Sequence, residues 1–453
     1  MARPTPDPQA SARPTSLPAV EESGRTRGAR PRFQWIGLIG LLIAAACFRA
    51  TQNMALTTFS LLAHDAVGLG IAAIGGLAAV AAAVTVAVNL GIASRVPVER
   101  SRIAAAGGIA LMLPALALLA TAHSFLALGL GTVLLGAGGG VVFPALATAI
   151  GQAEPAARER ALALFTLTLS GSLAIGPLLE SGILGISRQD LRSPFLAFLL
   201  LPCLGLAALG LSSRVGSGHR PRASQDLDAP VVADGTAGSR GIGTSVAYAR
   251  ERAISVLRRS PLGNPGWRMA VTAQLLYSVP FAAITVFGAV LARSAFGVTP
   301  EQAQLGFSCF FVTSLAARAL VAWRAPISRK IPVLLWSGAL TLAGLLLLAT
   351  GHGFGLLLVA MGILGVPHGL TFPIVLAQVA ESAGPGGLAG ANAALLAVSN
   401  STSIVVPALL GVLIPATGYR GMAMVLLLPV VGFGAILWSQ RKFEFSPGGA
   451  VVG

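Results

Sequence analysis

Long apolar runs constrain this chain more than any other feature. A helix of about 20 apolar residues crosses the roughly 30 Å of hydrocarbon in a bilayer, and twelve such runs follow one another here. Only 10% of the residues are charged and the mean hydropathy is +0.79, whereas soluble chains carry about 25% charged residues. The chain is therefore predicted to be an all-α membrane protein with twelve transmembrane helices. The predicted spans are residues 35–61, 69–92, 103–121, 124–149, 160–184, 194–213, 267–292, 304–322, 332–350, 354–378, 388–416 and 419–439.

The basic residues indicate how these spans are oriented. With the N-terminus in the cytoplasm, 25 of the 31 lysines and arginines fall in inner segments and four fall outside. This asymmetry follows the positive-inside rule. The net charge of +15 is thus interpreted as a topology signal and a contact for anionic lipids, not as a nucleic-acid surface. We expect a multi-pass protein of the cytoplasmic (inner) cell membrane with both termini in the cytoplasm.

Polar segments divide the chain into five predicted parts. A disordered cytoplasmic tail (1–32) rich in Pro, Arg and Ser precedes a six-helix bundle (33–213). A cytoplasmic linker (214–266), with one short amphipathic helix near 244–259, leads to a second six-helix bundle (267–440) and a cytoplasmic tail (441–453). The three cysteines all fall in apolar runs, and we expect them to be small packing residues rather than disulfide or metal partners.

The second half of the sequence repeats the first. SRVP at 94–97 matches WRAP at 323–326, and LLATAHSF at 118–125 matches LLATGHGF at 347–354. Both matches share an offset of 229 residues, close to half the chain. Each half holds six spans, so the two copies have the same orientation. Two parallel repeats with a substrate site between them are typical of transporters.

With these features the chain resembles the major facilitator superfamily over about residues 35–440. The resemblance includes GAGGGVVFPALATAI in span four and SLAIGPLLESG in span five, which is similar to a motif typical of exporters. It implies twelve-helix secondary transport, with spans one, four, seven and ten around a central cavity. The family's cytoplasmic turn motif is incomplete. The position where an acidic residue is usual holds Ser94 in the first copy and Trp323 in the second. Arg95 and Arg324 are retained and are assigned to gating.

Several kinds of chemistry are not supported by the sequence. A Walker A motif is excluded, because both lysines follow an arginine rather than a glycine. No hydrolase motif, metal-ligand spacing or catalytic constellation is visible. We therefore expect no enzyme activity, no catalytic residue, no metal and no cofactor, and transport driven by a gradient rather than by ATP. Pro144, Pro177 and Pro373 are predicted to kink spans that move during gating.

Two charged residues lie deep within predicted spans. Arg49 interrupts span one, and Glu180 is the carboxylate placed most clearly inside the membrane, in the outer half of span five. Such residues are costly in lipid and are functional hypotheses by default. We assign Glu180 to proton coupling, with Arg49 either pairing with it or holding an anionic group of the substrate. The alternative is a fixed ion pair between spans one and five. Arg318, near the cytoplasmic end of span eight, is assigned as a topology or gating charge.

Uncharged polar residues mark candidate substrate walls. Gln52 and Asn53 extend the Arg49 side of span one at helical spacing. By the resemblance to the family, span seven provides the matching wall, and span ten contributes a histidine. The alternative is ordinary hydrogen bonding between helices. The residues assigned to substrate binding are Arg49, Gln52, Asn53, Gln274, Tyr277, Ser278 and His368.

The favoured function is proton-coupled efflux of a drug-like or metabolite substrate, as an antiporter that works by alternating access. The expected partners are a small-molecule substrate, the proton gradient and membrane lipids, with the protein a monomer. One alternative is an anion or organic-acid carrier that uses Arg49, although span seven has Ser278 at the equivalent position. Another is a membrane sensor with the same fold that transports nothing.

Overall fold

The computed structural model describes residues 32–92, 95–152, 155–216, 264–383 and 388–443. Within these ranges the chain is helical and contains no strand. The tails predicted at 1–32 and 441–453 lie almost wholly outside the described residues. The amphipathic helix predicted near 244–259 lies outside them altogether.

The first half of the described chain forms one helical bundle. Its crossing helices are α1 (Arg32–Leu61), α2 (Ile71–Gly91), α3 (Ser101–Ala120), α4 (Phe125–Gly151), α5 (Pro155–Ile186) and a sixth crossing made of α6 (Ser193–Ala197) and α7 (Leu200–Gly216). A π-helical turn, η1 (Leu62–Ala66), extends α1, and a 3-10 turn, η3 (Val98–Arg100), precedes α3. These helices match the six apolar runs predicted for the first half.

The second half forms a bundle of the same kind. It contains α9 (Pro265–Phe296), α10 (Pro300–Arg324), α11 (Lys330–Thr350), α12 (Gly353–Ser382), α13 (Leu388–Ser439) and a final 3-10 turn, η4 (Gln440–Phe443). Eleven helices in the described residues are long and apolar enough to cross a membrane. The longest, α13, consists of two helices that meet at Gly418, whose φ of 70° breaks the helical path. Counting its two arms gives the twelve predicted crossings.

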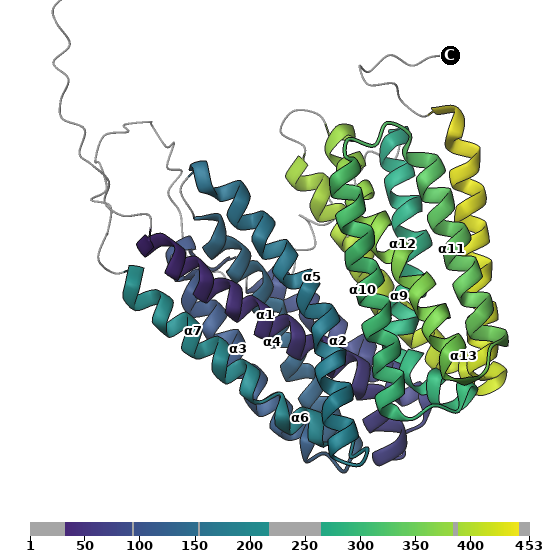
Figure 1. Cartoon of the computed structure of the whole chain (residues 1–453), viewed down its shortest axis with the longest axis horizontal. Helices are drawn as coiled ribbons and strands as arrows, with labels where there is room; N and C mark the ends of the chain where they lie inside the picture. Colours follow the sequence, from purple (N-terminus) through teal and green to yellow (C-terminus); the bar gives the residue numbers. More distant parts are fainter. Residues whose placement is uncertain (1–31, 93–94, 153–154, 217–263, 384–387, 444–453) are drawn as a thin grey trace, which may run out of the picture.

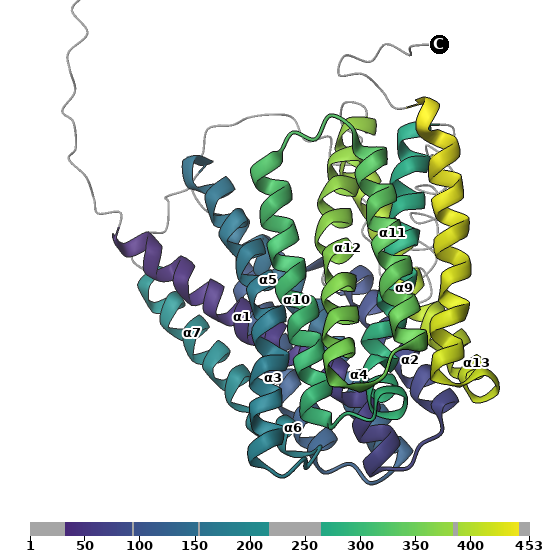
Figure 2. The ribbon, with the colours of Figure 1, turned by 45° about the vertical axis from the view of Figure 1, so that its right-hand side comes forward.

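The two bundles lie side by side and diverge toward one end. Figure 1 shows the first bundle in purple to teal and the second in green to yellow, and Figure 2 shows the same divergence after rotation. We call the end where α1 begins and α13 ends the terminal side. The opposite end, where α1 and α9 finish, is the distal side. The bundles converge on the distal side and splay apart on the terminal side.

Close helix packing joins the bundles toward the distal side. Helix α2 packs against α13, α5 against α10, and α1 against α9. The closest approach involves Gly75 of α2, where an added Cβ would collide with the carbonyl oxygen of Pro407 and lie 3.0 Å from Cα of Gly411. Small residues allow such contacts between membrane helices. We call this contact the glycine seal, defined by Gly75, Pro407 and Gly411.

The glycine-rich run at 136–140 packs helices inside the first bundle. Thr85 of α2 donates a hydrogen bond from Oγ1 to the carbonyl oxygen of Gly136 at 3.0 Å. On another face of α4, a Cβ at Gly139 would collide with the amide of Gln52 from α1. The run therefore packs both α1 and α2 closely against α4.

The sequence repeat is also a repeat of contacts on the distal side. In the first bundle, Arg192 Nη2 donates to the carbonyl oxygen of Ala122 at 3.1 Å. In the second, Arg420 Nη2 donates to the carbonyl oxygen of Gly351 at 3.0 Å, and 351 is 122 plus the repeat offset of 229. Arg420 Nη2 also donates to Ala295 at 2.7 Å. Each arginine thus caps helix ends within its own bundle, where carbonyl groups lack helical partners.

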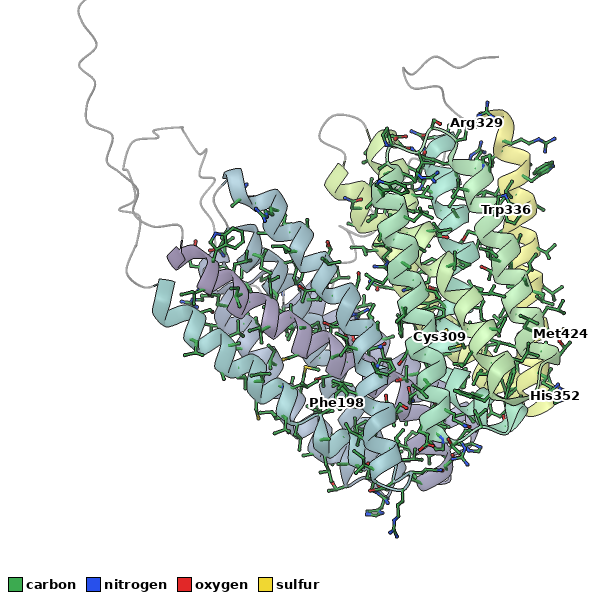
Figure 3. All side chains as sticks on the ribbon, in the orientation of Figure 1. Phe198, Cys309, Arg329, Trp336, His352 and Met424 are labelled. Atoms are coloured by element: carbon green, nitrogen blue, oxygen red, sulfur yellow. The ribbon has the colours of Figure 1, made fainter. Side chains whose placement is uncertain are left out.

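Arg420→Gln is expected to lower the free energy of unfolding by about 2 kcal/mol, because hydrogen bonds from a charged donor to buried carbonyls are worth about 1.5–3 kcal/mol. Thermal unfolding of the purified protein in detergent checks this. Arg329→Gln is the matched control, because Arg329 is exposed at the terminal side (Figure 3). Equal melting temperatures for the two variants would contradict the capping role.

Candidate functional site

Arg318 of α10 connects the two bundles at mid-depth. Its Nη1 donates to Ser170 Oγ of α5 at 3.1 Å, across the bundle interface. Its Nη2 lies 3.3 Å from Nε2 of His368 on α12, within its own bundle. The sequence suggested that Arg318 reaches toward the membrane surface. The structure instead directs its guanidinium into the interface, because its face of α10 packs against α5.

His368 is buried among aromatic rings. Its ring stacks on Phe281 with centroids 4.3 Å apart, and the rings of Tyr277 and Phe310 lie 5.3 Å from it. A guanidinium group can only donate hydrogen bonds. Nε2 of His368 therefore acts as the acceptor in this contact. These aromatic residues and His368 also line a small cavity between α9, α10, α11 and α12.

Arg49 of α1 faces the same region from the first bundle. Its Nη1 donates to Gln52 Oε1 at 2.9 Å, one helical turn along α1. Asn53, one helical turn beyond Arg49 on α1, donates to the carbonyl oxygen of Leu173 on α5. Because Arg318 reaches Ser170 of the same helix, Arg49 and Arg318 approach α5 at the same depth. The structure thus brings together residues from five helices, α1, α5, α9, α10 and α12. We call this group the cationic cluster, consisting of Arg49, Gln52, Ser170, Tyr277, Arg318 and His368.

Glu180 lies apart from Arg49. Its side chain is fully buried, and Thr57 Oγ1 donates to its Oε2 at 3.3 Å. Thr57 is eight residues beyond Arg49, which is about 12 Å along the helix. Among the described residues Glu180 forms no ion pair. Of the two arrangements predicted for Arg49, the structure therefore does not form the pair with Glu180, and Arg49 bonds to Gln52 instead.

Three of the proposed substrate-binding residues are buried elsewhere. Asn53 donates from Nδ2 to the carbonyl oxygen of Leu173 at 3.0 Å inside the first bundle. Gln274 donates from Nε2 to Ser399 Oγ of α13 at 2.7 Å, and Ser278 is 5% exposed. Tyr277 differs from these three residues, because its ring contacts His368. A role in substrate binding stays a prediction for them.

The residues assigned to gating are all within or beside helices. Arg95 donates to the carbonyl oxygen of Gly91 at 2.7 Å, and the Arg324 guanidinium lies over the Trp323 ring at 5.1 Å. Neither forms an ion pair with a described residue. Three prolines lie inside helices, as predicted: Pro144 in α4, Pro177 in α5 and Pro373 in α12. Their role in gating stays a prediction.

An ion pair on the distal side joins the bundles and was missed in the sequence. Arg293 Nη1 at the end of α9 lies 2.9 Å from Asp65 Oδ2 in η1. His64 Nδ1 lies 2.6 Å from the other carboxylate oxygen of Asp65. A signal was present, because His64 and Arg293 are separated by the repeat offset of 229. Asp65 follows His64 directly, so the ends of two equivalent helices carry an acidic and a basic residue. Such ends are candidates for contact between the repeats.

Two parallel six-helix bundles, with a charged cluster between them, define a multi-pass membrane protein of the transporter class. The chain belongs to the Major Facilitator Superfamily, whose sequence profile matches residues 41–294 and 273–443. This confirms the family and the fold class expected from the sequence. No curated protein compared with the chain is a significant sequence match.

Solved structures share this fold at low sequence identity. A bacterial homologue of the human lysosomal transporter Spinster, inward-facing and unoccupied, aligns with a TM-score of 0.66 and 12% identity, over 93% of this chain and 100% of that chain. The nucleoside transporter NupG gives 0.62 and 13%, over 90% and 99%. A POT family transporter in complex with a thioalcohol-conjugated peptide gives 0.67 and 12%, over 90% and 96%.

Proposed function

We propose that this chain is a secondary active transporter that moves a small molecule across the cytoplasmic membrane by alternating access. The observation that carries the proposal is the position of the cationic cluster. It lies at mid-depth between two bundles that are packed together on the distal side and splayed on the terminal side. A transporter needs a polar site near the midplane between two repeats that rock around it.

The terminal side is proposed to face the cytoplasm, on the basis of the charge asymmetry. The arrangement described here is then the cytoplasm-open state, closed toward the exterior by the glycine seal and the Asp65–Arg293 pair. In the opposite state these two contacts separate. The site residues we propose for substrate are those of the cationic cluster, with Arg49 on one bundle and Arg318 on the other.

Glu180 is proposed to couple transport to protons. Its carboxyl group is fully buried, and its Oε1 has no hydrogen-bond partner among the described protein atoms. A buried carboxyl group is far more stable neutral than ionised. Because Glu180 lies on α5, which packs against α10 at the bundle interface, separation on the distal side admits water near it. Export in exchange for protons is the proposed direction, supported by the exporter-like motif around Gly176.

Two distal distances are the expected result for a protein that alternates between states. Spin labels at Ala66→Cys and Ser294→Cys, both exposed positions at the distal ends of the bundles, report their separation by pulsed electron resonance. Cys47, Cys203 and Cys309 are replaced first, since each is a free thiol. We expect a short distance that corresponds to this structure and a longer distance from the distal-open state.

A control pair within one bundle separates opening from general disorder. Labels at Ser294→Cys and His352→Cys both lie on the distal side of the second bundle, where His352 is seen in Figure 3. This distance is expected to stay unimodal. A single short distance for the first pair under all conditions of pH and added solute contradicts alternating access and favours a static sensor.

A further inference from the structure

The cationic cluster holds two guanidinium charges without a carboxylate beside them. Arg49 and Arg318 lie at the same depth beside α5, because Asn53, one turn beyond Arg49, bonds to Leu173 and Arg318 bonds to Ser170. Like charges in a low-dielectric interior repel strongly. The described acidic residues that form ion pairs are Asp65 and Glu381, and both pair with other bases. Glu180 is bonded to Thr57. Uncompensated charge at this depth is costly, so it requires an opposite charge from elsewhere.

Both arginines also have unused donors. A guanidinium group carries five N–H donors. Within the described residues, Arg49 uses one of its nitrogens in a bond to Gln52, and Arg318 uses two, to Ser170 and His368. Nε of Arg318 is buried without a protein acceptor. The protein acceptors that are present are neutral, so neither arginine has its charge matched.

We infer that the cationic cluster binds the oxyanion group of the transported molecule, a carboxylate or a phosphate ester, between Arg49 and Arg318. This inference rests on the proposed function and identifies the chemical class of its substrate. Planar guanidinium groups suit oxyanions because they donate parallel hydrogen bonds to two oxygens. The aromatic rings beside His368 supply an apolar wall for the remainder of the molecule.

An oxyanion in this position also links the two bundles. Arg49 belongs to the first bundle and Arg318 to the second, so an anion held by both attracts the bundles toward each other. Without an anion, the contact between the bundles at this depth is weaker. It is a hydrogen bond from Arg318 to the neutral hydroxyl group of Ser170. A bound anion therefore stabilises approach of the bundles, as transport requires. Span seven has Ser278 at the position equivalent to Arg49, so the second arginine for binding an anion is Arg318 of α10.

Binding to the purified full-length protein in detergent tests the inference with three matched pairs of probes. These are succinate against succinamide, benzoate against benzamide, and glycerol 3-phosphate against glycerol. Binding is measured as the ligand-dependent rise in melting temperature, since a ligand of the folded state alone stabilises it. We expect at least one anion to bind, and its neutral partner to produce no shift at the same concentration.

The arginine variants locate the binding. Arg49→Gln and Arg318→Gln are each expected to weaken binding of that anion by about tenfold or more, the effect of losing one charged hydrogen bond. Arg49→Lys and Arg318→Lys keep the charge but lose the two parallel N–H donors of the guanidinium group. Intermediate affinities are expected for these variants. Arg268→Gln is the control, because Arg268 is exposed near the start of α9. Helical content and elution volume verify that each variant is folded.

Three results overturn the inference. These are absence of a shift with every anion, equal binding of an anion and its neutral partner, and wild-type affinity in both glutamine variants. The spin-label pair at the distal side separates this failure from failure of the proposed function. Two distal distances without anion binding support the proposed transport function and contradict the oxyanion inference. A single distal distance contradicts the transport proposal, whether or not an anion binds.

Discussion

Gly75→Val is expected to shift the protein from the distal-closed state toward the distal-open state. The glycine seal leaves no room for a side chain, because a Cβ at Gly75 would collide with the Pro407 carbonyl oxygen. Overpacking of this kind costs about 1–3 kcal/mol, which changes an equilibrium by about 5–150-fold. The contact is made between bundles, so the cost falls on the closed state rather than on the fold of either bundle. The distal spin-label pair checks this as a gain of the longer distance.

Gly76→Val provides a closely matched control. Gly76 is the next residue of the same helix, and nothing lies within 4 Å of a Cβ added there. The two substitutions change helix propensity alike but differ in contact. We expect Gly76→Val to keep the wild-type distances. If Gly75→Val also keeps them, the glycine seal does not hold the distal side closed.

Glu180→Gln is expected to remove the dependence of the distal distances on pH. The Glu180 carboxyl group favours the distal-closed state when neutral and the distal-open state when ionised, because an ionised group is destabilised by burial. Raising the pH should therefore populate the longer distance in the wild type, by up to about tenfold per pH unit for one proton. Glutamine resembles the neutral acid, and its side-chain oxygen can still accept from Thr57. The variant should remain distal-closed at all pH values.

Two other residues near the distal side need controls in that experiment. His64 contacts Asp65, and Glu301 lies in the first turn of α10, close to Gly185. His64→Gln and Glu301→Gln are expected to keep the pH response. A wild-type response in Glu180→Gln would assign proton coupling to another group. A lost response in His64→Gln would assign it to the distal ion pair.

Most of the fold could be predicted because the bilayer imposes it. Apolar runs of the length needed to cross hydrocarbon define each helix, and positions of charge define the turns between them. The two arms of α13 illustrate the strength of this signal. The break at Gly418 has almost no polar loop, yet two separate runs at 388–416 and 419–439 were visible.

The site was harder to predict, because hydropathy gives depth but not the direction in which a side chain points. Arg318 lies close enough to a helix end to reach the membrane surface, and only the packing of α10 on α5 shows that it points inward. The sequence predicts that Arg49 and Glu180 both lie deep within spans, with a pair between them as one possibility. The two turns of helix between Arg49 and Thr57 separate them in the folded protein.

The location of the Asp65–Arg293 pair has a consequence for the environment in which the protein works. Among the described residues it is the one ion pair between the bundles, and its partners are exposed, at 39% for Arg293 and 24% for Asp65. Exposed pairs contribute about 0–1 kcal/mol, and dissolved ions weaken them over a Debye length of about 10 Å at 0.1 M. The ionic strength at the distal side is therefore expected to shift the balance between the two proposed states, by about fivefold at most. Under the proposed orientation the distal side faces the exterior, so external salt is expected to act on the protein without binding to it.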